Sequence, residues 1–106
     1  MAILDDRENA FENKFAHDEE LRFRTIAKRN KLLGLWAAEL LGKRGAEADA
    51  YAAQVVAVNF EHERHEDVFE KIRTDFDAAG LDWSDSEIRL QMVELLAVAS
   101  EQVLKT

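Results

Sequence analysis

The feature that most constrains the fold of this chain is the absence of proline, combined with a total of only four glycines. Proline interrupts helices, and tight hairpins usually need glycine or asparagine-glycine turns, so a chain like this can form long helices but few hairpins. Hydrophobic residues make up 47% of the 106 residues and charged residues 34%, which is typical of one globular domain. The sequence therefore predicts an all-α fold.

Composition also limits the chemistry and the location of the protein. The chain has no cysteine, which excludes disulfides and thiolate metal sites. No apolar run is long enough to span a bilayer, and the acidic start at Asp5 and Asp6 is unlike the basic start of a secretory signal. We therefore expect a cytoplasmic protein without membrane insertion.

Charge is segregated along the sequence. Residues 1–20 carry a net charge of −5, residues 21–44 carry +6, and residues 45–106 carry −9. A basic segment between acidic flanks either marks a binding surface or is neutralised by those flanks within the fold. The sequence leaves both interpretations open.

Four helices are predicted from periodicity and capping signals. Asp5 and Glu8 have the spacing of a capping box, and Gly42 suits the position after a helix end, so the first helix is expected over residues 6–41, about 54 Å at 1.5 Å per residue. The second helix is expected over residues 46–60, although the valines at positions 55, 56 and 58 also suit a strand. No partner strand exists elsewhere in the sequence, which favours helix.

The two later helices have clearer boundaries. The third is expected to begin at Asp67, with Glu70 completing a capping box, and to end before Gly80. The fourth is expected over residues 85–104, because Ser84 and Glu87 form a second capping box. Trp83 and Ile88 flank that box at the positions of a hydrophobic staple.

The first helix is predicted to have two apolar faces that do not join. Its C-terminal half has the 3-4 spacing of a packed seam, formed by Phe23, Ile26, Asn30, Leu33, Ala37 and Leu40. Phe11 and Phe15 lie earlier and on a different phase. The shorter helices cannot cover a 54 Å helix, so residues 1–18 are expected to form an arm that projects or is mobile, and residues 19–106 a four-helix bundle. The alternative is that both phenylalanines fold back onto the core.

Several segments resemble one protein family. They are DDRE at residues 5–8, AFE at 10–12, KFAHD at 14–18, RNKLLGLWAAELLG at 29–42 and DVF at 67–69. These segments are similar to the zeta subunit, the ATPase inhibitor of alphaproteobacterial F-type ATP synthases. The resemblance implies a four-helix, non-catalytic regulatory protein, monomeric when free and bound peripherally to the F1 sector. It also implies that the N-terminal segment enters a catalytic interface between the alpha, beta and gamma subunits and blocks ATP hydrolysis.

Carried onto this sequence, the inhibitory segment is residues 1–18. Phe11 and Phe15 are the expected apolar anchors. The expected partner-binding set as a whole is Asp6, Arg7, Glu8, Phe11, Glu12, Lys14 and Phe15.

The second hypothesis is a module that binds a nucleotide such as ATP or ADP, or another anion. Phosphates would be neutralised by the basic set Arg22, Arg24, Lys28, Arg29 and Lys31, and a base would stack on Trp36 or Tyr51. Against this, Trp36 lies in the most apolar stretch and the cations face several directions. Nucleic-acid binding is disfavoured, because the acidic remainder of the chain would repel a phosphate backbone.

Catalysis and metal binding have little support. No serine lies beside a plausible base, and GKRG at residues 42–45 lacks the spacing of a phosphate-binding loop. His62 and His65 are three residues apart among glutamates, but this spacing does not match the histidine pair of zinc-binding helices. We therefore expect a protein without enzymatic activity, cofactor or metal.

Overall fold

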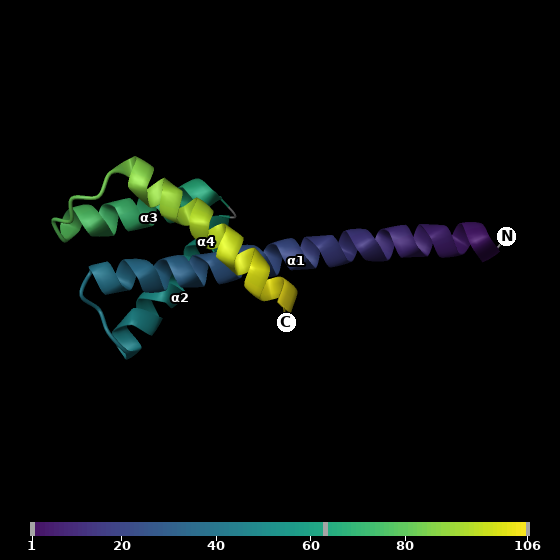
Figure 1. Ribbon diagram of the computed structural model, residues 1–106, viewed down its shortest axis with the longest axis horizontal. Coiled ribbons are helices and arrows are strands. Elements are labelled where there is room, and N and C mark those ends of the chain that lie inside the picture. Colours follow the sequence, from purple (N-terminus) through teal and green to yellow (C-terminus); the bar gives the residue numbers. More distant parts are fainter. Residues whose placement is uncertain (1, 63, 106) are drawn as a thin grey trace.

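The computed structural model describes the backbone of residues 2–62 and 64–105, and the side chains of residues 18–59 and 64–105. Over these residues the chain forms four α-helices and no strand (Figure 1). In chain order they are α1 (Ala2–Leu40), α2 (Ala46–His62), α3 (His65–Ala78) and α4 (Asp85–Lys105). The predicted all-α, four-helix fold is confirmed.

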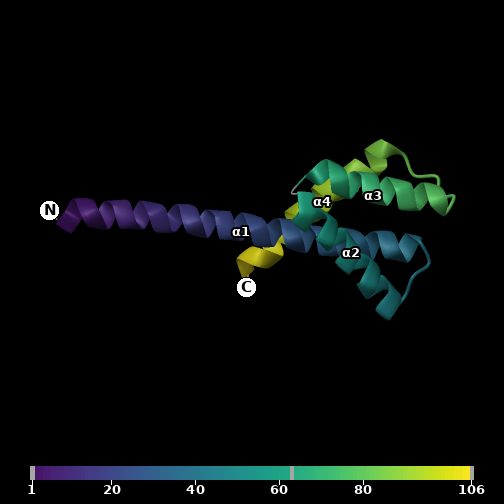
Figure 2. The same ribbon diagram turned by 180° about the vertical axis from the view of Figure 1, so that it is seen from behind.

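Helix α1 is the central element of the bundle. Its 39 residues correspond to about 58 Å at 1.5 Å per residue. The helix begins at Ala2, earlier than the Asp5–Glu8 pair predicted. Helices α2, α3 and α4 gather around its C-terminal half, as both views in Figures 1 and 2 show. The predicted projection of the N-terminal arm concerns residues whose side chains lie outside the described part, so it stays a prediction.

Helices α1 and α2 approach each other closely at Gly34. A Cβ atom added to Gly34 would lie 2.6 Å from the Cα of Ala52 and 3.3 Å from the Cβ of Val55. Only a residue without a side chain allows this separation of the two backbones. The block of residues 29–42 thus contains a point at which the backbones of α1 and α2 approach closely.

Two helix ends follow the glycine signals in the sequence. After α1, Lys43 N–H donates to Ala38 O at 2.9 Å, and Gly42 takes the left-handed conformation with φ 79. After α3, Leu81 N–H donates to Phe76 O at 2.9 Å, and Gly80 has φ 72. Both are Schellman motifs, which satisfy the last carbonyl groups of a helix.

The start of α4 is as predicted, whereas the start of α3 is not. Glu87 N–H donates to Ser84 Oγ, and Ser84 N–H donates to Glu87 Oε1, both at 3.1 Å, which completes the capping box. Helix α3 begins two residues before Asp67, after an extended Arg64, and has no side-chain cap. The Asp67 carboxylate instead accepts a hydrogen bond from Arg64 Nε at 3.3 Å and lies in the first turn, where the helix dipole favours a negative charge.

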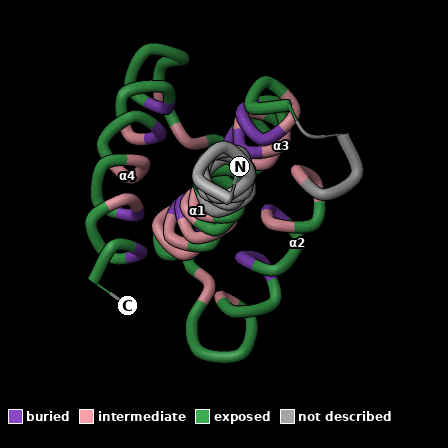
Figure 3. Tube along the Cα trace, turned by 90° about the vertical axis from the view of Figure 1, so that its right-hand side faces the viewer, coloured by how far each residue is buried: buried purple, intermediate pink, exposed green. Residues whose placement is uncertain are grey.

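The core lies where all four helices face one another. Helix α1 contributes Leu33 and Ala37, both fully buried as the seam predicted, and the fully buried Phe76 of α3 packs against both Trp36 and Trp83. Figure 3 shows buried positions of α2, α3 and α4 turned toward α1. Phe23 departs from the predicted seam: its side chain is 53% exposed, because it lies beyond the core at the wall of an open groove.

Candidate functional site

The predicted inhibitory arm lies in the N-terminal part of α1. The backbone there is helical from Ala2 onward. All seven predicted partner-binding residues lie between Asp6 and Phe15, and the structure does not describe their side chains. Their contacts and exposure therefore stay predictions.

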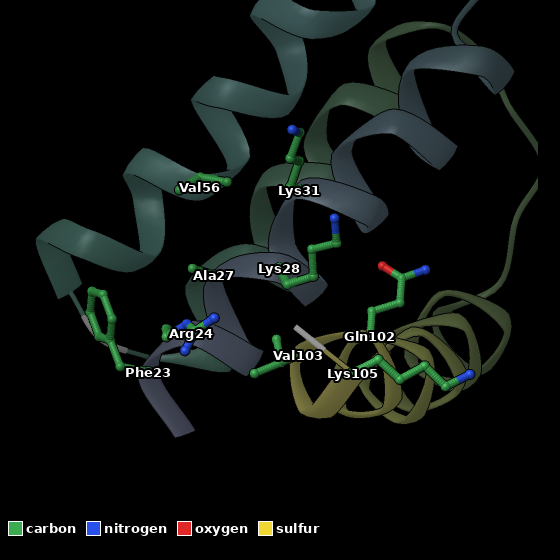
Figure 4. A pocket seen from close by; sticks show the side chains of 9 residues that line it. All are labelled: Phe23, Arg24, Ala27, Lys28, Lys31, Val56, Gln102, Val103 and Lys105. Carbon is green, nitrogen blue, oxygen red and sulfur yellow. The ribbon is translucent and has the colours of Figure 1, made fainter. Parts of the chain in front are cut away.

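A groove opens where α1 meets α2 and the C-terminal end of α4 (Figure 4). Its volume is about 690 Å³. The apolar part of its lining comes from three different helices, and consists of Phe23, Ala27, Val56 and Val103. The polar part consists of Arg24, Lys28, Lys31, Gln102 and Lys105.

The rim of this groove is cationic, although the protein as a whole has a net charge of −8. Arg24, Lys28 and Lys31 come from one side of α1, while Lys105 comes from the end of α4. Lys105 also forms an ion pair with Glu101 at 2.9 Å, but both side chains are highly exposed and such a pair contributes little. A groove lined by both apolar side chains and several cations suits an anionic ligand that has an apolar part.

The structure divides the basic set that the sequence predicted. Arg24, Lys28 and Lys31 line the groove, and Arg22 is exposed without lining it. Arg29 is buried, with 3% of its surface exposed, and does not line the groove. Burial lowers the pKa of Arg29 from its ordinary value.

Arg29 belongs to a polar cluster between α1 and the start of α3, in which Arg29 and Asn30 are buried and His65 is exposed. Its Nε donates to Asn30 Oδ1 at 2.7 Å, and its Nη2 lies 2.8 Å from His65 Nδ1. A guanidinium group only donates hydrogen bonds, so His65 Nδ1 accepts and the imidazole proton lies on Nε2. Desolvation lowers the pKa of His65, and the positive charges of Arg29 and Arg22 lower it further.

The same contact bears on the metal hypothesis. His65 Nδ1 is engaged by Arg29, and His62 lies outside the described side chains. Within the described side chains, no group of three histidine or carboxylate residues is arranged to hold a metal ion.

The two aromatic rings proposed for base stacking do not line the groove. Trp36 packs on Phe76 and Trp83, with ring centroids 5.7 Å and 5.2 Å away. Tyr51 is 4% exposed, and its hydroxyl donates to Asp75 Oδ2 at 2.7 Å. Desolvation, followed by this hydrogen bond and the charge of Asp75, raises the pKa of Tyr51.

The aromatic ring that lines the groove is instead Phe23. The groove also includes three residues of α4 that the sequence did not predict as ligand-binding. Gln102, Val103 and Lys105 reach the groove only because α4 crosses α1 near its own end. No local pattern in the sequence relates positions 23–31 to positions 102–105, so no sequence signal could have placed them together.

In the described part of the chain, no helix combines the length and apolar character needed to cross a membrane.

Comparison with known proteins identifies the family. No curated protein matches the sequence. A solution NMR structure of a protein 46% identical to this one aligns with a TM-score of 0.70, over 80% of this chain and 96% of that chain. The model of the family ATPase inhibitor subunit zeta matches residues 1–102, and the protein therefore belongs to this family of ATPase inhibitor subunits.

Proposed function

We propose that this protein inhibits ATP hydrolysis by the F1 sector of an ATP synthase, and that residues 1–18 insert at a catalytic interface. The observation that carries the proposal is the family match, which includes the arm because it spans residues 1–102. Helix lengths support it: α1 has 39 residues and α4, the next longest, has 21. The difference corresponds to about 27 Å of helix at 1.5 Å per residue, more than the bundle needs.

The mechanism requires no chemistry from the inhibitor. A helix that binds one rotary conformation of F1 more tightly than the others traps the enzyme in that conformation, and the difference in affinity sets the inhibition. Residues four apart share one face of a helix, so Phe11 and Phe15 would enter an apolar groove together. Asp6, Arg7, Glu8, Glu12 and Lys14 would make the surrounding polar contacts.

The test compares three full-length proteins in a hydrolysis assay with purified F1. The double variant Phe11→Ser and Phe15→Ser removes both proposed anchors, and burying one such ring is worth about 1.5–3 kcal/mol. We therefore expect its half-inhibitory concentration to rise at least tenfold, since about 1.4 kcal/mol is a factor of ten. The matched control is Phe23→Ser, which changes the same residue type on the same helix, and it should inhibit like the unaltered protein.

Circular dichroism would show that both variants keep their helices. Equal inhibition by the Phe11→Ser, Phe15→Ser variant and the unaltered protein would remove the arm from the mechanism. No inhibition by the unaltered protein would reject the function itself.

The groove supports a second candidate function, the binding of a nucleotide or another phosphorylated anion. Three members of the basic segment, Arg24, Lys28 and Lys31, line this groove together with Lys105 and apolar side chains. The groove volume of about 690 Å³ lies within the range of small-molecule sites. Phe23 supplies a partly exposed ring beside these cations.

ATP, ADP and inorganic pyrophosphate distinguish the parts of this ligand. If the groove binds nucleotides, ATP and ADP should shift the amide signals of residues 23–31 and 102–105 in NMR spectra. The variant Lys28→Ala, Lys31→Ala should weaken the shifts, whereas Arg22→Ala, a basic residue outside the groove, should not. Shifts with all three ligands indicate a phosphate site alone, and shifts with none of them reject the candidate.

A further inference from the structure

Helix α4 exposes an unusual number of large apolar side chains. Of the five such side chains exposed in the described part of the protein, four belong to α4: Leu90 at 58%, Val93 at 66%, Val98 at 41% and Leu104 at 71%. The buried side of α4, which includes Ile88, Met92 and Ala99, packs against the bundle. Figure 3 shows α4 at the edge of the molecule with its exposed positions turned outward.

These exposed side chains are ordered along one face. Leu90, Val93, Ala97 and Leu104 are separated by three, four and seven residues, the spacing of one face of a helix. We call these four residues the α4 stripe. Val98 lies outside it, farther around the helix. Single exposed apolar residues are ordinary on protein surfaces, but an aligned set on one helix marks an interaction site.

A row of acidic side chains borders the α4 stripe. Glu87, Glu94 and Glu101 are exposed and follow one another at intervals of seven residues, so they lie along the same edge of the helix. Glu101 has an ion pair with Lys105, but both are exposed and the pair is readily exchanged. An apolar stripe beside a glutamate row is complementary to a helix that carries an apolar stripe beside lysines or arginines.

A second copy of this chain does not fit the α4 stripe. A twofold dimer brings the same patch of both copies together. Antiparallel pairing of two α4 helices about Ala97 would place Glu94 of one copy close to Glu101 of the other. Like charges at this spacing oppose association.

We propose that the α4 stripe and its glutamate row dock a basic amphipathic helix on the surface of the F1 sector. The stripe from Leu90 to Leu104 is about 21 Å long, so the docked helix would have about four turns. That the docked helix belongs to F1 is inferred from the proposed function. That it is basic and amphipathic is inferred from α4 alone.

Docking at α4 would make inhibition bivalent. The arm is the N-terminal part of α1, whereas α4 packs against the C-terminal half of the same helix. Once α4 is attached, the arm meets its own site as a tethered group, which raises its effective concentration. A body contact of this kind changes the concentration needed for inhibition but not the extent of inhibition at saturation.

The test measures affinity for purified F1 and inhibition of its hydrolysis, using full-length proteins. The variant Leu90→Gln, Leu104→Gln should weaken binding and raise the half-inhibitory concentration at least tenfold, with unchanged maximal inhibition. Val98→Gln is the matched control, because it makes the same kind of change on α4 outside the stripe, and it should alter affinity less than twofold. Glu94→Lys, Glu101→Lys should weaken binding most at low salt.

Each outcome decides a separate point. Unchanged affinity of the Leu90→Gln, Leu104→Gln variant overturns the docking surface while leaving the arm mechanism intact. Equal losses from the Val98→Gln control overturn it as well. If sedimentation shows a dimer that the stripe variant abolishes, the occupant is a second copy and the proposal is wrong. Absence of any F1 binding by the unaltered protein rejects both this inference and the proposed function.

Discussion

Replacing Gly34 with alanine tests the packing at the centre of the fold. The new Cβ would lie 2.6 Å from Ala52 Cα and 3.1 Å from Ala52 Cβ. Ordinary carbon contacts are about 3.5–4 Å, so α1 and α2 must separate by about 1 Å. The nearest atom belongs to the backbone, which cannot rotate away as a side chain does.

Two effects of opposite sign set the magnitude. Overpacking of a well-packed interface costs about 1–3 kcal/mol, and the shift of two helices belongs at the upper end. Alanine in place of glycine within a helix contributes about 1 kcal/mol in favour of folding. The net expectation is a loss of about 1–2 kcal/mol in the free energy of unfolding, which corresponds to a decrease of about 5–10 °C in Tm.

Urea unfolding and differential scanning calorimetry would measure this loss, and the double variant with Ala52→Gly is the control. Removing the Ala52 side chain relieves the 3.1 Å contact but leaves the 2.6 Å contact with its backbone, so the rescue should be partial. An increase in Tm for Gly34→Ala would show that helix propensity outweighs packing here and would refute the reasoning. Complete rescue by Ala52→Gly would place the clash on the side chain instead.

Three further substitutions test single contacts. Tyr51→Phe removes the 2.7 Å bond to Asp75 and should lower the free energy of unfolding by about 1–2 kcal/mol in urea; a neutral result would contradict the bond. Ser84→Ala should cost about 1 kcal/mol and speed amide exchange in the first turn of α4, and unchanged exchange would count against the cap. His65 has a lowered pKa when folded, so the unfolded chain binds a proton first and stability should fall as pH falls through about 6.5. His65→Gln should flatten this part of the stability profile, measured against the unaltered protein; equal slopes would reject the role of His65.

Sequence alone determined the elements whose signals are local. Ser84 with Glu87, Gly42 and Gly80 mark helix ends through hydrogen bonds that span only a few residues, so their patterns are readable without a fold. The pattern at Asp67 and Glu70 was equally clear, yet the prediction was wrong. Helix α3 already includes His65, which contacts Arg29, a residue 36 positions earlier in the sequence. The Asp67 carboxylate accepts a hydrogen bond from Arg64 instead of capping the helix.

Tertiary structure decided which side chains are buried and which are brought together. Periodicity predicted that Phe23 belongs to the packed seam, and Arg29 was named among the cations that could bind an anion. In the structure Phe23 is 53% exposed and Arg29 is buried. The reason is geometric. The exposure of a side chain on α1 depends on where α2, α3 and α4 cross this helix, and the sequence of α1 does not determine where they cross. The same crossing brings Lys28 and Lys105 into the lining of one groove and leaves the outer face of α4 uncovered. By contrast, the glycine and proline content, together with the periodicity and capping signals, was enough to predict a bundle of helices.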